Sequence, residues 1–185
     1  MKTFPQLQTQ RLLLNRPVQS DTDDLIKQLN TDSAFSENTL SIPFPYKIED
    51  AQFFMENLVN KGFEDQTNFT FAIRQKEQPA LIGAIGIHID FKNKKAELGY
   101  WLGKDFWNRG FVTEALKEVI RFGFTDLHLN KLYASHFPHN PASGKIMMNC
   151  GMNLEAQLKE EYFKNGKHID VLRYSILKTD FENGI

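Results

Sequence analysis

Residues 96 to 124 constrain the fold most, because a strand pattern, a glycine-bearing loop and an amphipathic helix follow one another there. The strand is expected over residues 96–102, where Gly99 favours a bulge or a close approach of backbone. The helix is predicted from apolar side chains that recur at helical spacing, namely Val112, Ala115, Leu116, Val119, Ile120 and Phe124. A strand followed by a one-sided apolar helix indicates a sheet with helices packed on it.

The loop from Phe106 to Ala115 joins this strand to the helix and has the chemistry of an anion site. The first N–H groups of a helix lack intrahelical acceptors, and the helix dipole places partial positive charge there. A pyrophosphate can therefore accept several backbone hydrogen bonds at this position. Gly110 permits close approach of the backbone, and Arg109 adds a permanent positive charge. Taken alone, the same pattern is also typical of an ordinary turn with a solvated arginine.

The rest of the chain supplies further strands and helices, which together predict a mixed sheet. Strands are expected at 11–16, 68–74, 80–90, 131–137, 154–163 and 168–177. Helices are expected from an N-cap at Ser20-Asp21 to about residue 30, at 49–61, and at 141–150. Pro141 suits the first turn of the last of these helices, and Gly151 suits its C-terminal cap.

Finer patterns predict how some of these segments face the core. Four apolar residues of the strand at 80–90 are expected to share one face: Leu81, Ile85, Ile87 and Ile89. The dipeptide Asn165-Gly166 predicts a tight turn between the last two strands. The segment 31–47 carries three aromatic residues that either line a pocket or, more simply, cover the edge of the core: Phe35, Phe44 and Tyr46.

The composition bounds the class of protein. With 185 residues, 41% of them hydrophobic, the chain suits one domain over residues 1–185 with a core from about 8 to 178. A net charge of -1 gives no general attraction to nucleic acid or to an anionic membrane. We expect a cytoplasmic protein, because no signal peptide or membrane-length apolar run is evident and the single Cys150 fits a reducing compartment.

Several kinds of chemistry are disfavoured by the motifs. The chain has no G-x-x-x-x-G-K-[ST] string and no G-x-G-x-x-G between a strand and a helix, so nucleotide-triphosphate and nicotinamide binding lose support. His136 and His139 lack acidic or cysteine companions, and we predict no metal. Cys150 follows a helix C-terminus, where no positive field lowers a thiol pKa, so it is expected to be buried filler rather than a nucleophile.

Three segments in order resemble the GNAT superfamily of acetyltransferases: Glu97–Leu102, Trp107–Ala115, and Asn140–Ser143 with Gly151-Met152. The resemblance is closer to the ribosomal-protein N-terminal, or Rim-type, branch. It extends from Arg11–Leu14 to the final hairpin and so covers nearly the whole chain. It implies an α/β fold with a central, mixed, largely antiparallel and splayed sheet of about seven strands, flanked by about four helices.

The resemblance also implies acetyl-CoA as cosubstrate, lying in a V-shaped gap of the sheet with no metal. Its pantetheine is expected to pair with the strand at Tyr100, Trp101 and Leu102. Its pyrophosphate is expected on backbone amides of the loop formed by Trp107, Asn108, Arg109, Gly110, Phe111, Val112 and Thr113. The chain departs from the common pattern at the first two of these, where the superfamily often has glutamine or arginine and then glycine.

Two side chains are candidates for the chemistry. Glu97 is the candidate base, acting through water, since a desolvated carboxylate has a raised pKa; an exposed or salt-bridged glutamate is an equal alternative. Ser143 is the candidate donor to the departing CoA sulfur, as the resemblance implies. Asn140 is expected to hold a pantetheine amide and Lys145 to reach a CoA phosphate, while helix capping and a solvated lysine are the simpler interpretations.

These expectations indicate an enzyme that moves an acetyl group to a primary amine by direct attack, here the N-terminal α-amine of a ribosomal or other protein. An α-amine has a pKa of about 8, against about 10.4 for lysine, and so needs a weaker base. Two alternatives stay open, namely a small-molecule amine acceptor (polyamine, metabolite or antibiotic) and a non-catalytic acyl-CoA-binding module. No nucleic acid or membrane partner is expected, and a homodimer is compatible with the sequence.

Overall fold

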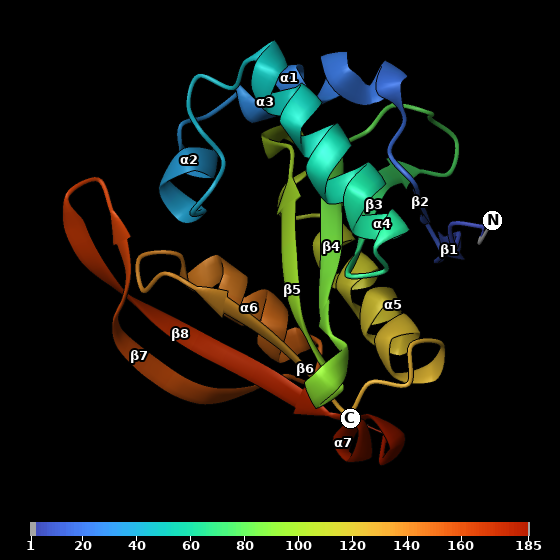
Figure 1. Ribbon diagram of the computed structural model, residues 1–185, viewed down its shortest axis with the longest axis vertical. Helices are drawn as coiled ribbons and strands as arrows, with labels where there is room; N and C mark the ends of the chain where they lie inside the picture. The colour runs from blue at the N-terminus through green and yellow to red at the C-terminus, as the bar shows by residue number, and fades with distance from the viewer. Residues whose placement is uncertain (1–2, 185) are drawn as a thin grey trace.

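The computed structural model describes residues 3 to 184 and contains one eight-stranded sheet (Figure 1). Its strands are β1 (Leu7–Gln8), β2 (Leu12–Asn15), β3 (Asn68–Gln75), β4 (Gly83–Asp90), β5 (Lys95–Leu102), β6 (Lys131–His136), β7 (Asn153–Lys164) and β8 (Lys167–Leu177). They lie in the order β1-β2-β3-β4-β5-β6-β8-β7. Among the described strands, β5 and β6 pair in parallel and the other pairs are antiparallel.

The helices are α1 (Thr22–Leu29), α2 (Ala34–Asn38), α3 (Ile48–Phe53), the π-helical η2 (Phe54–Lys61), α4 (Gly62–Glu64), α5 (Phe111–Thr125), α6 (Pro141–Asn149) and α7 (Lys178–Glu182). The predicted mixed, largely antiparallel sheet with helices is confirmed. The counts are larger than expected because β1, α2, α4 and α7 have two to five residues each, too short to show a sequence period.

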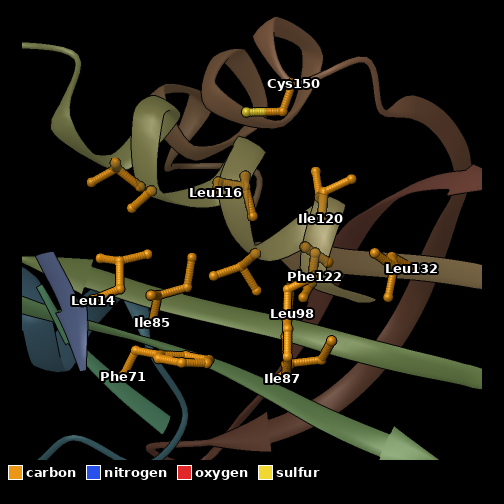
Figure 2. Close-up of a cluster of buried hydrophobic side chains, with 14 of the residues drawn as sticks. Leu14, Phe71, Ile85, Ile87, Leu98, Leu116, Ile120, Phe122, Leu132 and Cys150 are labelled. Carbon is orange, nitrogen blue, oxygen red and sulfur yellow. The ribbon is translucent and has the colours of Figure 1, made fainter. Parts of the chain in front are cut away.

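The helices cover both faces of the sheet. α5 and α6 lie on one face, and α1, α3 and η2 lie on the other (Figure 1). The apolar stripe predicted for α5 is buried at every position. Figure 2 shows how it packs on the sheet, with Leu116 and Ile120 of α5 above Ile85, Ile87 and Leu98 of the strands. This cluster is the main core, and the opposite face holds a smaller one.

One prediction about strand β4 is wrong. Leu81 was expected to share a face with Ile85 and Ile87, but it packs in the smaller cluster while Ile82 joins the main core. The reason is that the strand begins at Gly83, so the alternation of faces does not extend back to residue 81.

Most of the predicted helix caps and turns are confirmed. Gly151 ends α6 with a φ of 81°, and the predicted hairpin turn places Asn165 and Gly166 at φ values of 50° and 77°. The expected N-cap at Ser20-Asp21 does not form with a side chain on α1. The Asp21 carboxylate instead accepts from the Val18 N–H at 2.8 Å and forms a buried ion pair with Arg74.

The loop at 31–47 contains α2 and places its aromatic residues in two ways. Phe35 and Tyr46 are buried in the smaller core cluster, whereas Phe44 is half exposed. Tyr46 also contributes to the wall of a cavity described below. Within residues 3–184, no helix combines the length and the apolar character needed to cross a bilayer.

The sheet opens between β5 and β6. Their residues pair from Lys95↔Lys131 to Glu97↔Tyr133 and no further, although both strands continue. On its other side β5 stays in register with β4 along its whole length, so Gly99 forms no bulge and lies opposite Gly86. The backbone of β5 beyond residue 97 therefore has one free edge, which is the predicted splay.

Candidate functional site

A cavity of about 630 Å³ passes through this opening. Its wall includes Leu25 and Leu29 of α1 on one side of the sheet and Ser143 and Met147 of α6 on the other. Because these helices cover opposite faces, the cavity connects the two faces at the free edge of β5. A molecule lying in it can reach groups on both faces at once.

The cavity brings together some predicted site residues and leaves others outside. Glu97, Tyr100, Trp101 and Ser143 line it. The remaining predicted residues are not part of its wall: Leu102, Trp107, Asn108, Arg109, Gly110, Phe111, Val112, Thr113, Asn140 and Lys145. Most of these form the loop before α5 and the start of that helix, on the face opposite α1.

Glu97 lies on β5 at the last pair before the opening. Burial raises the pKa of this carboxyl group, Arg173 opposes the shift, and Glu161 adds to it. Arg173 forms an ion pair with Glu161 at 3.5 Å, and no cation of the described residues lies within 4 Å of the Glu97 carboxylate. The salt-bridged alternative is therefore not what the structure contains.

Ser143 lies in the first turn of α6, and its position is fixed by two neighbours. Asn140 caps the helix, with its Oδ1 accepting from the Ser143 N–H at 3.4 Å and its Nδ2 donating to Ser143 Oγ at 3.3 Å. The Tyr100 hydroxyl donates to the Ser143 carbonyl at 3.2 Å, and burial raises the Tyr100 pKa, so it stays protonated. The Ser143 hydroxyl hydrogen is left free to donate into the cavity.

The loop before α5 has the backbone geometry of an anion cradle. Asn108 and Gly110 both adopt left-handed conformations, with φ values of 60° and 76°. Asparagine is one of the few non-glycine residues that tolerates this region, so it can replace the glycine usual in the superfamily. Among the described residues, none accepts a hydrogen bond from the backbone N–H groups of residues 108 to 113. Successive free N–H groups beside left-handed residues fit a pyrophosphate.

Trp107 supports this loop with its side chain. Its indole Nε1 donates to the Leu102 carbonyl at 2.6 Å, and its ring packs edge-on against Phe35 at 5.9 Å. Trp101 packs against the same phenylalanine at 6.0 Å. The indole therefore ties the end of β5 to the loop, and its side-chain N–H is not free for a phosphate.

Arg11 is a loop-supporting residue that sequence reasoning missed. Its guanidinium pairs with Glu114 at 2.6 Å, donates to the Arg109 carbonyl at 2.9 Å and lies over the Phe111 ring. No local pattern links residue 11 to residues 109–114, so this role shows only in the fold. The side chains of Arg109 and Lys145 are exposed, as expected for cations that reach solvent or a flexible ligand.

A row of polar side chains on the α1 face was also missed. Pairing places Asn68, His88, Glu97 and Tyr133 side by side across β3, β4, β5 and β6. All four line a second cavity of about 360 Å³, and His88 and Glu97 belong to the walls of both cavities. His88 is accessible from the cavity, yet the protein packed around it lowers its pKa. At neutral pH it is therefore an uncharged neighbour of Glu97.

Cys150 and the histidines do not form a reactive cluster. Cys150 is buried, and burial raises the pKa of its thiol to about 12, which agrees with its expected inertness. His136 is buried beneath α6, with Nδ1 2.8 Å from the Phe137 carbonyl. Within residues 3–184, no three His, Cys, Asp or Glu side chains are grouped so as to hold a metal ion.

Comparisons with known proteins agree with this geometry. The family model for the acetyltransferase (GNAT) domain matches residues 11–153. The uncharacterized N-acetyltransferase p20 of Bacillus licheniformis is 32% identical over 176 residues, 95% of this chain and 97% of that protein. The spermidine N(1)-acetyltransferase of Vibrio cholerae is 30% identical over 130 residues, 70% of this chain and 75% of that protein.

The fold is shared with solved structures as well. RimL, a ribosomal L7/L12 alpha-N-protein acetyltransferase in complex with coenzyme A, aligns with a TM-score of 0.84 at 19% identity, covering 94% of this chain and 98% of that chain. Other structural neighbours hold acetyl-CoA or CoA. The family match and the relative of nearly equal length show that this chain belongs to the GNAT family and is an acetyl-CoA-dependent N-acetyltransferase.

Proposed function

We propose that this enzyme acetylates the N-terminal α-amine of a polypeptide by direct attack. The observation that carries the proposal is the cavity through the open sheet, with Glu97 on one face and Ser143 on the other. Acetyl-CoA supplies an activated thioester. The residues around the cavity must then remove a proton from the ammonium group, keep water out and stabilise the leaving thiolate.

The two candidate residues divide this work. The Glu97 carboxylate accepts one ammonium proton, directly or through water, so that the amine nitrogen can form its bond to the acetyl carbon. As the carbon–sulfur bond breaks, the Ser143 hydroxyl donates a hydrogen bond to the departing sulfur. The remaining excess proton on nitrogen passes to the thiolate, which leaves the amide and the free thiol.

The chemistry of the cavity wall supports a cationic acceptor with an apolar body. Its acidic members are Asp50 and Glu97, and no lysine or arginine of the described residues belongs to it. Most of the other wall residues on the α1 side are aliphatic or aromatic, including Phe53 and Phe54. An α-amine followed by apolar side chains matches this wall, and its pKa of about 8 suits a carboxylate base.

A small-molecule amine is the second candidate, because the rim of the cavity is bridged. Lys164 at the tip of the β7–β8 hairpin donates to the carbonyls of Ser36 and Thr39 beside α2. These segments lie close together at one side of the molecule (Figure 1). Because Thr39 belongs to the cavity wall, the bridge lies beside the cavity and favours a slender acceptor. The relative named spermidine N(1)-acetyltransferase acts, by its name, on a molecule of that kind.

A thiol-release assay with acetyl-CoA separates the candidates. The probes are a heptapeptide with a free N-terminal serine and one internal lysine, the same peptide with its N-terminus already acetylated, and spermidine. Turnover of the free peptide alone supports the proposal. Turnover of spermidine alone supports the second candidate, and CoA binding with no turnover of any probe supports a non-catalytic module. Sedimentation velocity tests the expected homodimer.

A further inference from the structure

Asn68, the first residue of β3, presents a buried amide oxygen that has no partner. The residue is 4% exposed, and its Nδ2 donates to the Leu58 carbonyl and to Thr70 Oγ1, both at 2.8 Å. Both amide hydrogens are thereby used, which fixes the orientation of the group, since a flipped amide would place its oxygen against the Leu58 carbonyl. No described residue donates to Asn68 Oδ1. Burying an amide oxygen in this way is costly unless a ligand supplies the donor.

This oxygen lies beside Gly86, which belongs to the wall of the first cavity, whereas Asn68 itself belongs to the wall of the second. A Cβ built on Gly86 would be 3.7 Å from Asn68 Oδ1 and 3.5 Å from His88 Nε2. Gly86 pairs with Gly99, where a Cβ would meet nothing within 4 Å. Two facing glycines thus leave space above the strands, with the Asn68 oxygen on the β3 side. Glu97 lies two residues from Gly99 on the same face of β5, beside the free edge of that strand.

A reacting amine has needs that this arrangement meets. After one proton has gone to the base, a primary amine keeps two N–H donors and one lone pair. The lone pair attacks the thioester only if the N–H groups are held in other directions. An acceptor for this purpose must not itself take up a proton, and an amide oxygen satisfies that condition whereas a second carboxylate would not.

We propose that Asn68 binds the acceptor amine, with Oδ1 accepting a hydrogen bond from the amine N–H in the hollow above Gly86 and Gly99. Glu97 removes the proton, and Asn68 orients the nitrogen that remains. This role rests on the proposed amine acetylation and adds a substrate-binding residue to it. It also accounts for the unpartnered oxygen, because the missing donor is the substrate.

The test compares the wild-type enzyme with Asn68→Leu, which keeps the approximate shape of the side chain and removes its acceptor, together with the two hydrogen bonds that Nδ2 donates to Leu58 and Thr70. The acceptors are the serine heptapeptide and spermidine, and three quantities are measured for each protein. These are kcat/KM for amine transfer, the Kd for CoA by calorimetry, and the slow hydrolysis of acetyl-CoA without amine. We expect kcat/KM to fall about 10- to 100-fold, as for the loss of one hydrogen bond to a developing charge. CoA affinity and hydrolysis should stay within twofold.

Two further variants keep the result interpretable. Asn68→Thr retains a hydroxyl that can donate to Leu58 and suits a strand, and it should show the same loss if Asn68→Leu does not fold. Asn57→Leu changes another asparagine of the second cavity, one that donates to Phe53, and should leave transfer unchanged. Normal transfer by both Asn68 variants overturns the inference, and so does a parallel loss of CoA affinity. A wild-type enzyme that binds CoA and acetylates neither probe contradicts the proposed function instead.

Discussion

The two faces of the β4–β5 ladder carry opposite kinds of side chain. Toward α5, the strands present Ile85, Ile87 and Leu98, which are fully or almost fully buried in the main core. Toward α1, the intervening positions present Gly86 and Gly99 as a facing pair, followed by His88 and Glu97 as the next pair. Because side chains alternate along a strand, one ladder supplies packing on one side and chemistry on the other.

Core packing and the proposed chemistry therefore depend on adjacent residues of the same strands, whose side chains point to opposite faces of the sheet. On the α5 face, the apolar side chains of the ladder belong to the main core cluster. The α1 face keeps a glycine hollow, a carboxylate without a close cation and an amide oxygen without a donor. Substitutions of the core side chains Ile85, Ile87 and Leu98 should change folding, and those of Gly99 and Glu97 should change turnover.

The largest effect is expected for Glu97→Gln. It removes the proposed base while keeping the shape of the side chain, and kcat should fall about 10²- to 10⁴-fold, the usual contribution of general base catalysis. CoA affinity by calorimetry should be unchanged, because the group lies on the opposite face from the α5 loop. A variant with normal kcat would contradict the role of Glu97.

The pH dependence sharpens the same prediction. Transfer needs the Glu97 carboxylate, and burial raises its pKa, so the acid limb of kcat/KM should lie above the range of an ordinary glutamate. Arg173 lowers this pKa, so Arg173→Met should move the limb to higher pH. A raised folded-state pKa also means that ionising Glu97 costs stability. Glu97→Gln should therefore unfold at higher denaturant concentration above that pKa, and the gain should vanish below the unfolded value of about 4.3.

A core substitution on the α5 face should lower stability and leave turnover nearly unchanged. Ile87→Ala leaves a cavity between β4 and α5 and should lower the free energy of unfolding by about 2–5 kcal/mol. Denaturant unfolding measures this loss. The kcat of the protein that remains folded should stay within about threefold of wild type, since Ile87 faces away from the hollow. A large fall in kcat would show that the two faces are coupled.

Gly99→Val tests whether the hollow is needed. A Cβ at this position meets no atom within 4 Å, and valine suits a strand, so the melting temperature should not fall. The side chain would fill the space above the Gly86 pair, and amine transfer should fall about 10-fold or more. A destabilised protein with normal transfer would reverse the assignment of this position.

The smallest effects are expected in the loop before α5. Gly110→Ala places a side chain at a φ of 76° and should cost about 1–2 kcal/mol, with weaker CoA binding. Asn108→Gly removes a tolerated left-handed asparagine and should leave CoA affinity unchanged or slightly higher. Thermal melts and calorimetry with CoA measure both. Equal effects of the two substitutions would show that backbone conformation does not set the affinity.

Much of the fold could be predicted because its signals are local. The stripe of α5, the Asn165-Gly166 turn and the Gly151 cap each depend on spacing within a few residues, and all three are confirmed. Leu81 was assigned to the wrong face because alternation says nothing about where a strand begins. The splay was expected from the family resemblance and not from a local signal, since it depends on where the pairing of β5 with β6 ends.

In the candidate site, too, the residues that stand in local motifs could be predicted, and those that act through long-range contacts could not. Glu97 and Ser143 could be proposed because they stand in motifs, and the structure places both on one cavity, while their roles stay predictions. The support given by Arg11 to the α5 loop joins segments about 100 residues apart, and no motif marks it. The unpartnered oxygen of Asn68 is a property of three-dimensional packing, because nothing in the sequence distinguishes this asparagine from any other asparagine in a strand.

The short parallel seam between β5 and β6 has a consequence for motion. Three residue pairs are the only strand pairing that joins β1–β5 to β6–β8 among the described residues. Amide hydrogens in this seam should exchange with deuterium sooner than those of the long β4–β5 ladder, because fewer bonds must open together. The sheet is thus expected to open transiently along this seam beside the cavity, and a ligand bound there should slow the exchange by joining the two halves.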